Sequence, residues 1–319
     1  MSEPERTDAL DFAIPASLEG VRVDRAVALL TGRSRSEVAS LVAQDRVEVN
    51  GRPARRAAEA LRAGDHVTVT PFAAVEEGVR PDPEVVVTVV AEAKDYVVVD
   101  KAAGVVVHPG AGQRDGTLIA GLLARYPEIA ALAEEPGSDP TRPGVVHRLD
   151  KGTSGLLVVA RTVRGRDSLV GQLSARTVRR EYVGLVEGHL AHDRGVVDAP
   201  IGRSANEPTR MAVRVDGREA RTHYEVVARL DEPATTLVRL RLETGRTHQI
   251  RVHMATIGHP VVNDTRYGHR RDRRLADGRV VLHAAHLGFV DPGTGRDVAW
   301  TSDLPTDLAS VLGDAAQAL

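Results

Sequence analysis

Residues 143–160 read Pro-Gly-Val-Val-His-Arg-Leu-Asp-Lys-Gly-Thr-Ser-Gly-Leu-Leu-Val-Val-Ala and place one carboxylate, Asp150, between two apolar stretches. The glycine and hydroxyl residues at 152–155 are typical of a tight backbone turn. The apolar run 156–160 then predicts a buried strand. A carboxylate held at the start of a strand can serve as a nucleophile or a base. The alternative is that Asp150 caps the turn, which is the commoner role of a lone aspartate there.

The composition indicates a globular protein without disulfides or a thiolate metal site. The chain has 319 residues, enough for two domains, and no cysteine. No apolar run reaches the roughly 18 residues that a membrane helix needs. The acidic start lacks the basic and then apolar pattern of a signal peptide, and we therefore expect a cytoplasmic protein.

The distribution of charge favours a nucleic-acid partner more than the net charge does. The formal net charge is −2, but 39 of the 42 basic residues are arginine, because lysine occurs only at positions 94, 101 and 151. Arginine suits phosphate and base edges, although a GC-rich genome also favours it. Acidic residues gather in other segments than basic ones, and a near-neutral protein can thus present a basic face.

The spacing of polar and apolar residues predicts two folded parts. We expect a disordered acidic tail at 1–17, a small module at 18–72, a proline-containing linker at 73–84 and a larger domain at 85–319. The module would contain two helices and then two strands, at 24–30, 37–44, 47–49 and 66–70. Ser34 or Ser36 would cap the second helix. In the larger domain the patterns predict helices at 117–126 and 167–174, and strands at 85–90, 96–100, 156–160, 181–187, 220–229 and 235–243.

Two further segments carry chemically suitable residues, and a third predicts a structural loop near the cleft. They are Arg180-Glu181-Tyr182, the run Leu-Glu-Thr-Gly-Arg-Thr-His-Gln-Ile-Arg-Val-His-Met at 242–254, and Gly-His-Pro-Val-Val-Asn-Asp-Thr-Arg-Tyr-Gly at 258–268. Together with His-Arg-Leu-Asp and the following Thr-Ser-Gly, they resemble the motifs of RluA-type RNA pseudouridine synthases. The order of elements in the module resembles an S4 domain, a small RNA-binding unit. Gly152 and Asn263 depart from the family pattern, which usually has an acidic residue and a glycine there.

The resemblance implies an α+β fold: a mixed, mostly antiparallel sheet with flanking helices, preceded by the small S4-like α/β domain. It implies that Asp150 is the catalytic group, that Arg251 pairs with it, and that the ring of Tyr182 stacks on the target base. Asp150 could attack C1′ of the ribose, attack C6 of the base, or assist loss of a proton from C2′. Neither a cofactor nor a metal is implied. His248 and His253 are also spaced unsuitably for a helical zinc site.

The resemblance further implies contacts to RNA. Arg148 would help to hold the target nucleotide out of its stack. Other residues that we expect to contact RNA are Arg246 and His248 in the large domain, and Arg25, Arg33, Arg35 and Arg52 in the module.

The layout is most similar to the RluD and RluC branch, which implies large-subunit (23S) ribosomal RNA as substrate. A monomer is the simplest expectation for the oligomeric state. Two alternatives stay open: a synthase that acts on transfer RNA, and a non-catalytic RNA-binding protein. A kinase is excluded, because the kinase motif has the order His-Arg-Asp.

Overall fold

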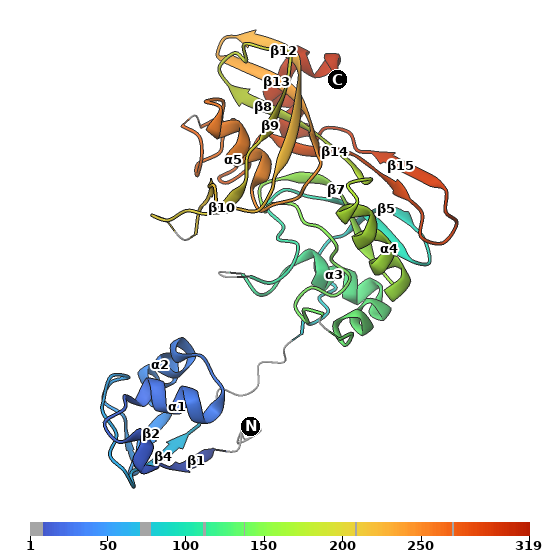
Figure 1. The fold of residues 1–319 in the computed structure, drawn as a ribbon. Coiled ribbons are helices and arrows are strands. Elements are labelled where there is room, and N and C mark those ends of the chain that lie inside the picture. Colours follow the sequence, from blue (N-terminus) through green and yellow to red (C-terminus); the bar gives the residue numbers. More distant parts are fainter. Residues whose placement is uncertain (1–8, 71–77, 111–112, 137, 208, 270) are drawn as a thin grey trace. The chain divides into compact units, whose positions relative to one another are not determined.

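The computed structural model describes residues 9–70, 78–110, 113–136, 138–207, 209–269 and 271–319. The chain forms two compact units, Met1–Glu77 and Gly78–Leu319 (Figure 1). Each unit is described by itself. In the described part of the chain, no helix has the length and apolar character to cross a membrane.

The N-terminal unit packs two helices on a four-stranded antiparallel sheet of order β1-β4-β2-β3. Its elements are β1 (Leu10–Ala13), η1 (Ala16–Leu18), α1 (Val23–Thr31), α2 (Arg35–Ala43), β2 (Val47–Val49), β3 (Arg52–Pro53) and β4 (His66–Val69). Ser34 caps α2 and forms a capping box with Glu37, as the sequence predicts for one of two serines. Val23, Val27, Leu41 and Val67 belong to a buried core of this unit.

The boundaries of the predicted tail and linker need correction. Residues 10–13 form β1 and pair with β4, because Phe12 packs against the core and Ile14 is buried within it. The predicted linker also extends too far: the Asp82 amide donates to the Ala120 carbonyl at 2.9 Å, and Val79 packs on the larger unit. The rest of these two predictions falls on residues 1–8 and 73–77, which lie outside the described residues.

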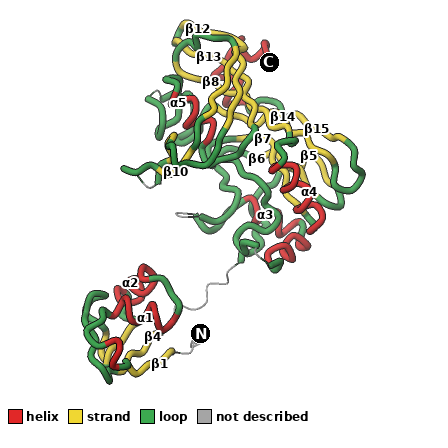
Figure 2. The backbone as a smooth tube through the Cα atoms, in the orientation of Figure 1, coloured by secondary structure: helices red, strands yellow, loops and turns green. Residues whose placement is uncertain are grey.

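The larger unit is built on one sheet of order β5-β6-β7-β14-β8-β13-β12-β9, with β15 paired to β14 (Figure 2). Its strands are β5 (Thr88–Glu92), β6 (Tyr96–Lys101), β7 (Ser154–Ala160), β8 (Arg179–Glu187), β9 (Arg194–Asp198), β12 (Arg221–Asp231), β13 (Ala234–Leu242), β14 (Leu282–Val290) and β15 (Asp297–Thr301). A separate hairpin joins β10 (Ile201–Arg203) to β11 (Met211–Val213). Only the β7–β14 pair is parallel among the described strand pairs of this sheet, which confirms the expected mixed, mostly antiparallel fold.

Helices lie against both faces of this sheet. They are α3 (Leu118–Arg125), η2 (Pro127–Ala133), α4 (Val163–Ser174), α5 (Gln249–Thr256), α6 (Thr306–Leu312) and η3 (Gly313–Ala318). Strand β6 shows why both faces need cover: Val97 and Val99 join the core beneath α3, whereas Val98 joins the core that contains Leu169 of α4. Tyr182, Leu240 and Leu282 lie in the same core as α3 and α5, and this face carries the candidate site.

Candidate active site

Asp150 lies in the turn immediately before β7, and close backbone packing fixes this turn. The Thr153 amide donates to the Asp150 carbonyl at 3.1 Å. A Cβ on Gly152 would lie 1.9 Å from the carbonyl oxygen of Gly278, so this backbone has no room for a side chain at position 152. Gly155 adopts φ +111° against β14, another position for glycine alone. The turn therefore aims Asp150 with little freedom, and its carboxylate is only 15% exposed.

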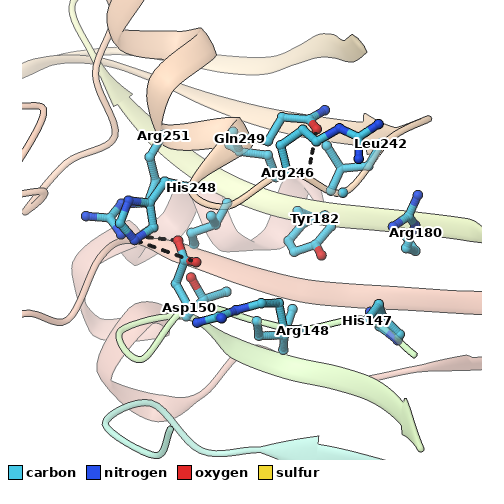
Figure 3. A pocket seen from close by; sticks show the side chains of 15 residues that line it. His147, Arg148, Asp150, Arg180, Tyr182, Leu242, Arg246, His248, Gln249 and Arg251 are labelled. Carbon is cyan, nitrogen blue, oxygen red and sulfur yellow. Dashed lines mark hydrogen bonds and ion pairs between the residues drawn. The ribbon is translucent and has the colours of Figure 1, made fainter. Parts of the chain in front are cut away.

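Arg251, from α5, joins two carboxylates. Its NH1 group donates to Oδ2 of Asp150 at 3.1 Å (Figure 3). Its Nε and NH2 groups donate to Asp264 at 2.6 and 2.9 Å. Burial alone would lower the pKa of Arg251, but the two carboxylates raise it overall. The structure thus places Arg251 against Asp150, in the pairing that the motif resemblance implies, and adds Asp264 as its second partner.

Tyr182 forms the middle of the pocket. It extends from β8, is 6% exposed, and lines the same pocket as Asp150 and Arg251. Burial raises the pKa of its hydroxyl to about 12, so the phenol is neutral at physiological pH. A neutral, largely buried ring beside Asp150 is suited to stacking on a base.

His248 stands at the start of α5 in the left-handed conformation, with φ 57°. Its Nδ1 lies 2.8 Å from the hydroxyl of Tyr267, and that hydroxyl accepts the Met211 amide at 3.0 Å. The phenolic hydrogen is then free to donate to Nδ1, so we assign the imidazole hydrogen to Nε2. Nε2 lies 4.0 Å from Oδ1 of Asp150. Burial lowers the pKa of His248, which keeps the ring neutral as a hydrogen-bond donor facing Asp150.

The other expected RNA contacts of this unit also line the pocket. Arg148 is exposed and donates to Nε2 of His108 at 3.2 Å, while burial lowers the pKa of His108 to about 4. Arg246 is half-buried and donates through Nε to the Glu219 carbonyl at 2.9 Å. Arg148 and Asp150, two residues apart, both face the pocket.

The four expected RNA-binding arginines of the module lie in the N-terminal unit. Arg35 pairs with the buried Asp24 at 3.0 Å, and Arg33 lies 3.7 Å from Glu37. Arg25 and Arg52 are exposed. Two of these side chains thus have protein partners while the other two point to solvent.

Some residues of the site were missed from the sequence. Asp264 and Tyr267 belong to the stretch that was interpreted only as a structural loop. Lys101 is 1% exposed, and its Nζ donates to the carbonyls of Ala102 and Val105 at 2.8 and 2.9 Å. Burial lowers the pKa of Lys101 to about 7. Arg180 also lines the pocket. The only sequence signal for these residues was their position within or beside a motif.

The described residues contain no group of three or more His, Cys, Asp or Glu that could hold a metal ion. His253, the second histidine considered for zinc, instead contacts the hydroxyl of Thr222 and the carbonyl of Ala199, both at 2.9 Å. It is a core histidine with both ring nitrogens occupied.

The fold and the pocket define an RNA-modifying enzyme with an attached RNA-binding module, and the comparisons with known proteins specify the family. Residues 95–256 match the RNA pseudouridylate synthase family, and residues 21–67 match the S4 domain. The chain belongs to the RNA pseudouridylate synthase family and isomerises uridine to pseudouridine in RNA.

The similar proteins extend over nearly the whole chain. Ribosomal large subunit pseudouridine synthase D of Nitrosomonas europaea is 40% identical over 97% of this chain and 88% of its own. An RNA pseudouridine synthase of Chloroflexus aurantiacus is 44% identical over 94% of this chain and 91% of its own. Among solved structures, human RNA Pseudouridylate Synthase Domain Containing 1 is 27% identical, with a TM-score of 0.55, and covers 72% of this chain and 89% of its own.

Proposed function

We propose that this enzyme modifies uridines of large-subunit ribosomal RNA and that Asp150 is its catalytic group. The names of several relatives support the substrate, since they are ribosomal large subunit pseudouridine synthases. The observation that carries the assignment of Asp150 is its 3.1 Å contact with Arg251 beside Tyr182 in one pocket.

The chemistry divides among these side chains. The N1–C1′ bond breaks, the base rotates, and a C5–C1′ bond forms, so the reaction has no net redox change. Asp150 acts at C1′, at C6 or on the C2′ proton, and the three routes stay open. Arg251 fixes the carboxylate of Asp150, and Tyr182 stacks on the base. His248 directs the hydrogen on Nε2 toward Asp150. Arg148 compensates the cost of removing the nucleotide from its stack.

The proposal extends to the whole chain. Residues 18–72 bind structured RNA through Arg25, Arg33, Arg35 and Arg52, and residues 85–319 perform the reaction. Arg246 adds a contact to RNA at the pocket. We propose a monomer that acts in the cytoplasm.

Pseudouridine mapping of ribosomal RNA, from cells with and without the gene, tests the proposal. We expect one or a few large-subunit sites to disappear and to return with the wild-type gene but not with Asp150→Asn. Asp216→Asn, a surface carboxylate paired with Arg214, is the matched control and should restore them. The purified Asp150→Asn protein should still bind the RNA. If the pseudouridine map of ribosomal RNA is unchanged, transfer RNA becomes the expected substrate. A fully active Asp150→Asn variant would overturn the assignment of Asp150.

A further inference from the structure

Arg180 is a buried cation of the pocket without a carboxylate partner. It is 5% exposed, and NH2 donates only to the main-chain carbonyl of Glu243, at 3.1 Å. Its Nε is buried without any hydrogen-bond partner. The carboxylate of Glu243 is directed elsewhere, to His223 at 2.6 Å and Arg221 at 3.3 Å. Over the described parts of the chain, no acidic side chain forms a salt bridge with Arg180.

Such a group is costly to keep, because an unpaired buried charge destabilises the fold. Arginine stays protonated even when burial lowers its pKa, as it does here. An unsatisfied buried donor in a native protein calls for an explanation, and a pocket for substrate offers one. Nε itself is buried, so the RNA would supply its acceptor to the terminal NH1 group beside it.

Gly245 leaves the end of Arg180 open. A Cβ at position 245 would lie 2.8 Å from NH1 of Arg180, and Gly245 itself is exposed. Its φ is not in the left-handed region, so the backbone does not demand glycine there. The missing side chain provides space beside the guanidinium.

Arg180 and Asp150 lie on opposite sides of the Tyr182 ring (Figure 3). Arg180 and Tyr182 are two residues apart on β8, so their side chains share one face at a spacing of roughly 6.6 Å. A nucleoside with its ribose at Asp150 and its base on Tyr182 therefore extends the far edge of the base toward Arg180. This step rests on the proposed function.

We propose that Arg180 binds the carbonyl at the far edge of uracil and stabilises the base while it is detached from the ribose. In uridine the ring atom opposite N1 is C4, which bears O4. In pseudouridine the ring atom opposite C5 is C2, which bears O2. A donor fixed at this place therefore meets a carbonyl oxygen both before and after the base rotates. Cytosine would present its amino group, which is a hydrogen-bond donor, and a guanidinium has no acceptor atom for it.

The cation also suits the charge that develops. When the N1–C1′ bond breaks, its electron pair stays on the base and spreads from N1 to O2 and O4. Arg180 offsets this negative charge from a largely buried position, where such stabilisation is strong. After rotation C5 bonds to C1′ and loses its proton, N1 gains one, and the base is neutral again.

Single-turnover release of tritium from C5 of the target uridine tests the proposal, on an RNA fragment that contains the mapped site. We expect Arg180→Met to slow release about 100-fold, as for loss of an oxyanion donor, with unchanged affinity and salt dependence. Arg179→Met removes the same charge from the exposed neighbour on β8 and should change nothing. Weaker binding with a flatter salt dependence and an unchanged rate would indicate a phosphate contact and overturn the proposal.

A 4-thiouridine at the target position separates a direct contact from a structural role. Sulfur accepts hydrogen bonds poorly, so it should slow the wild type and cause no added loss in Arg180→Met. An equal loss in both proteins would overturn the proposal. If Arg180→Met does not fold, the same measurements are made on Gly245→Ala, which places a methyl group against NH1 of Arg180. We expect the same pattern of results from this variant. Asp150→Asn abolishes product altogether whereas Arg180→Met leaves slow turnover, so failure of one assignment is distinct from failure of the other.

Discussion

Asp264 holds Arg251 through both of its carboxylate oxygens, at 2.6 and 2.9 Å, and its own side chain has no exposed surface. The amides of Arg266 and Tyr267 donate to the same carboxylate at 3.0 and 3.2 Å. The edge of the guanidinium formed by Nε and NH2 is thus fixed without RNA, and NH1 is directed at Asp150. The position of the proposed catalytic carboxylate therefore depends on an acidic residue that does not line the pocket.

Asp264→Asn should slow turnover and destabilise the protein. Asparagine can accept one bond from Arg251 but leaves its charge poorly compensated, so Arg251 would shift toward Asp150. We expect turnover to fall at least 10-fold, and the free energy of unfolding to fall by about 3 kcal/mol, typical of breaking a buried pair. Tritium release and urea unfolding measure the two effects. The surface control Asp216→Asn should change neither, and a fully active Asp264→Asn would contradict this role.

The stabilisation by Asp264 should depend on pH. Burial raises the pKa of Asp264, but bonds from Arg251 and the two amides outweigh it and hold the pKa below the usual range. A carboxylate with a depressed pKa stabilises the folded state at pH values above its ordinary pKa of about 4. This stabilisation is lost as the pH falls through the pKa that the group has in the folded state. The difference in unfolding free energy between wild type and Asp264→Asn should therefore be full at pH 7 and shrink toward pH 3. A difference independent of pH would exclude the ionic role.

The sequence predicted the residues that local motifs carry, and missed those that depend on distant parts of the chain. Asp150, Tyr182 and Arg251 each lie within a motif of the sequence, and the fold brings the three to one pocket. Asp264 reaches Arg251 only because Asn263 bends the loop at φ 64°. No periodicity encodes such a contact.

The central strand β14 escaped prediction for a related reason. His283 interrupts its apolar pattern, yet the folded protein accommodates this side chain. Its Nδ1 lies 2.9 Å from the Ser154 hydroxyl and its Nε2 lies 3.3 Å from the Ser302 carbonyl. Both partners lie outside β14, at 129 and 19 residues from His283, so the local pattern does not show how this polar side chain is accommodated.

Tyr267→Phe should impair catalysis without unfolding the protein. Loss of the hydroxyl removes the donor to Nδ1 of His248, so the hydrogen of the imidazole is no longer held on Nε2. We expect a roughly 10-fold lower rate with little change in RNA affinity, which is within the range for a positioned donor group. Tyr126→Phe is the control, since Tyr126 is equally buried but bonds to Glu92 outside the pocket. Equal reaction rates in Tyr267→Phe and Tyr126→Phe would show that His248 does not act as a positioned donor.

Arg148→Met should reveal a role in opening the RNA. Nucleotide flipping costs a few kcal/mol on a paired target and less on a mismatched one. The variant should therefore lose at least 10-fold in rate on an RNA with the target uridine paired, and clearly less when it is mismatched. Arg142→Met, at an exposed arginine six residues earlier, serves as control. The same loss on both RNAs would show that Arg148 acts after flipping.

The module should contribute affinity through phosphate contacts rather than chemistry. Arg25 and Arg52 are exposed, and replacing both with glutamine should reduce the slope of log affinity against log salt by about 2, or about 1 for each phosphate contact. The rate at saturating RNA should stay unchanged. Arg22→Gln is the matched control, because its guanidinium already donates twice to Asp24, at 3.0 and 2.9 Å. If the double variant keeps the wild-type slope while Arg22→Gln lowers it, the RNA-binding face of the module includes Arg22 instead.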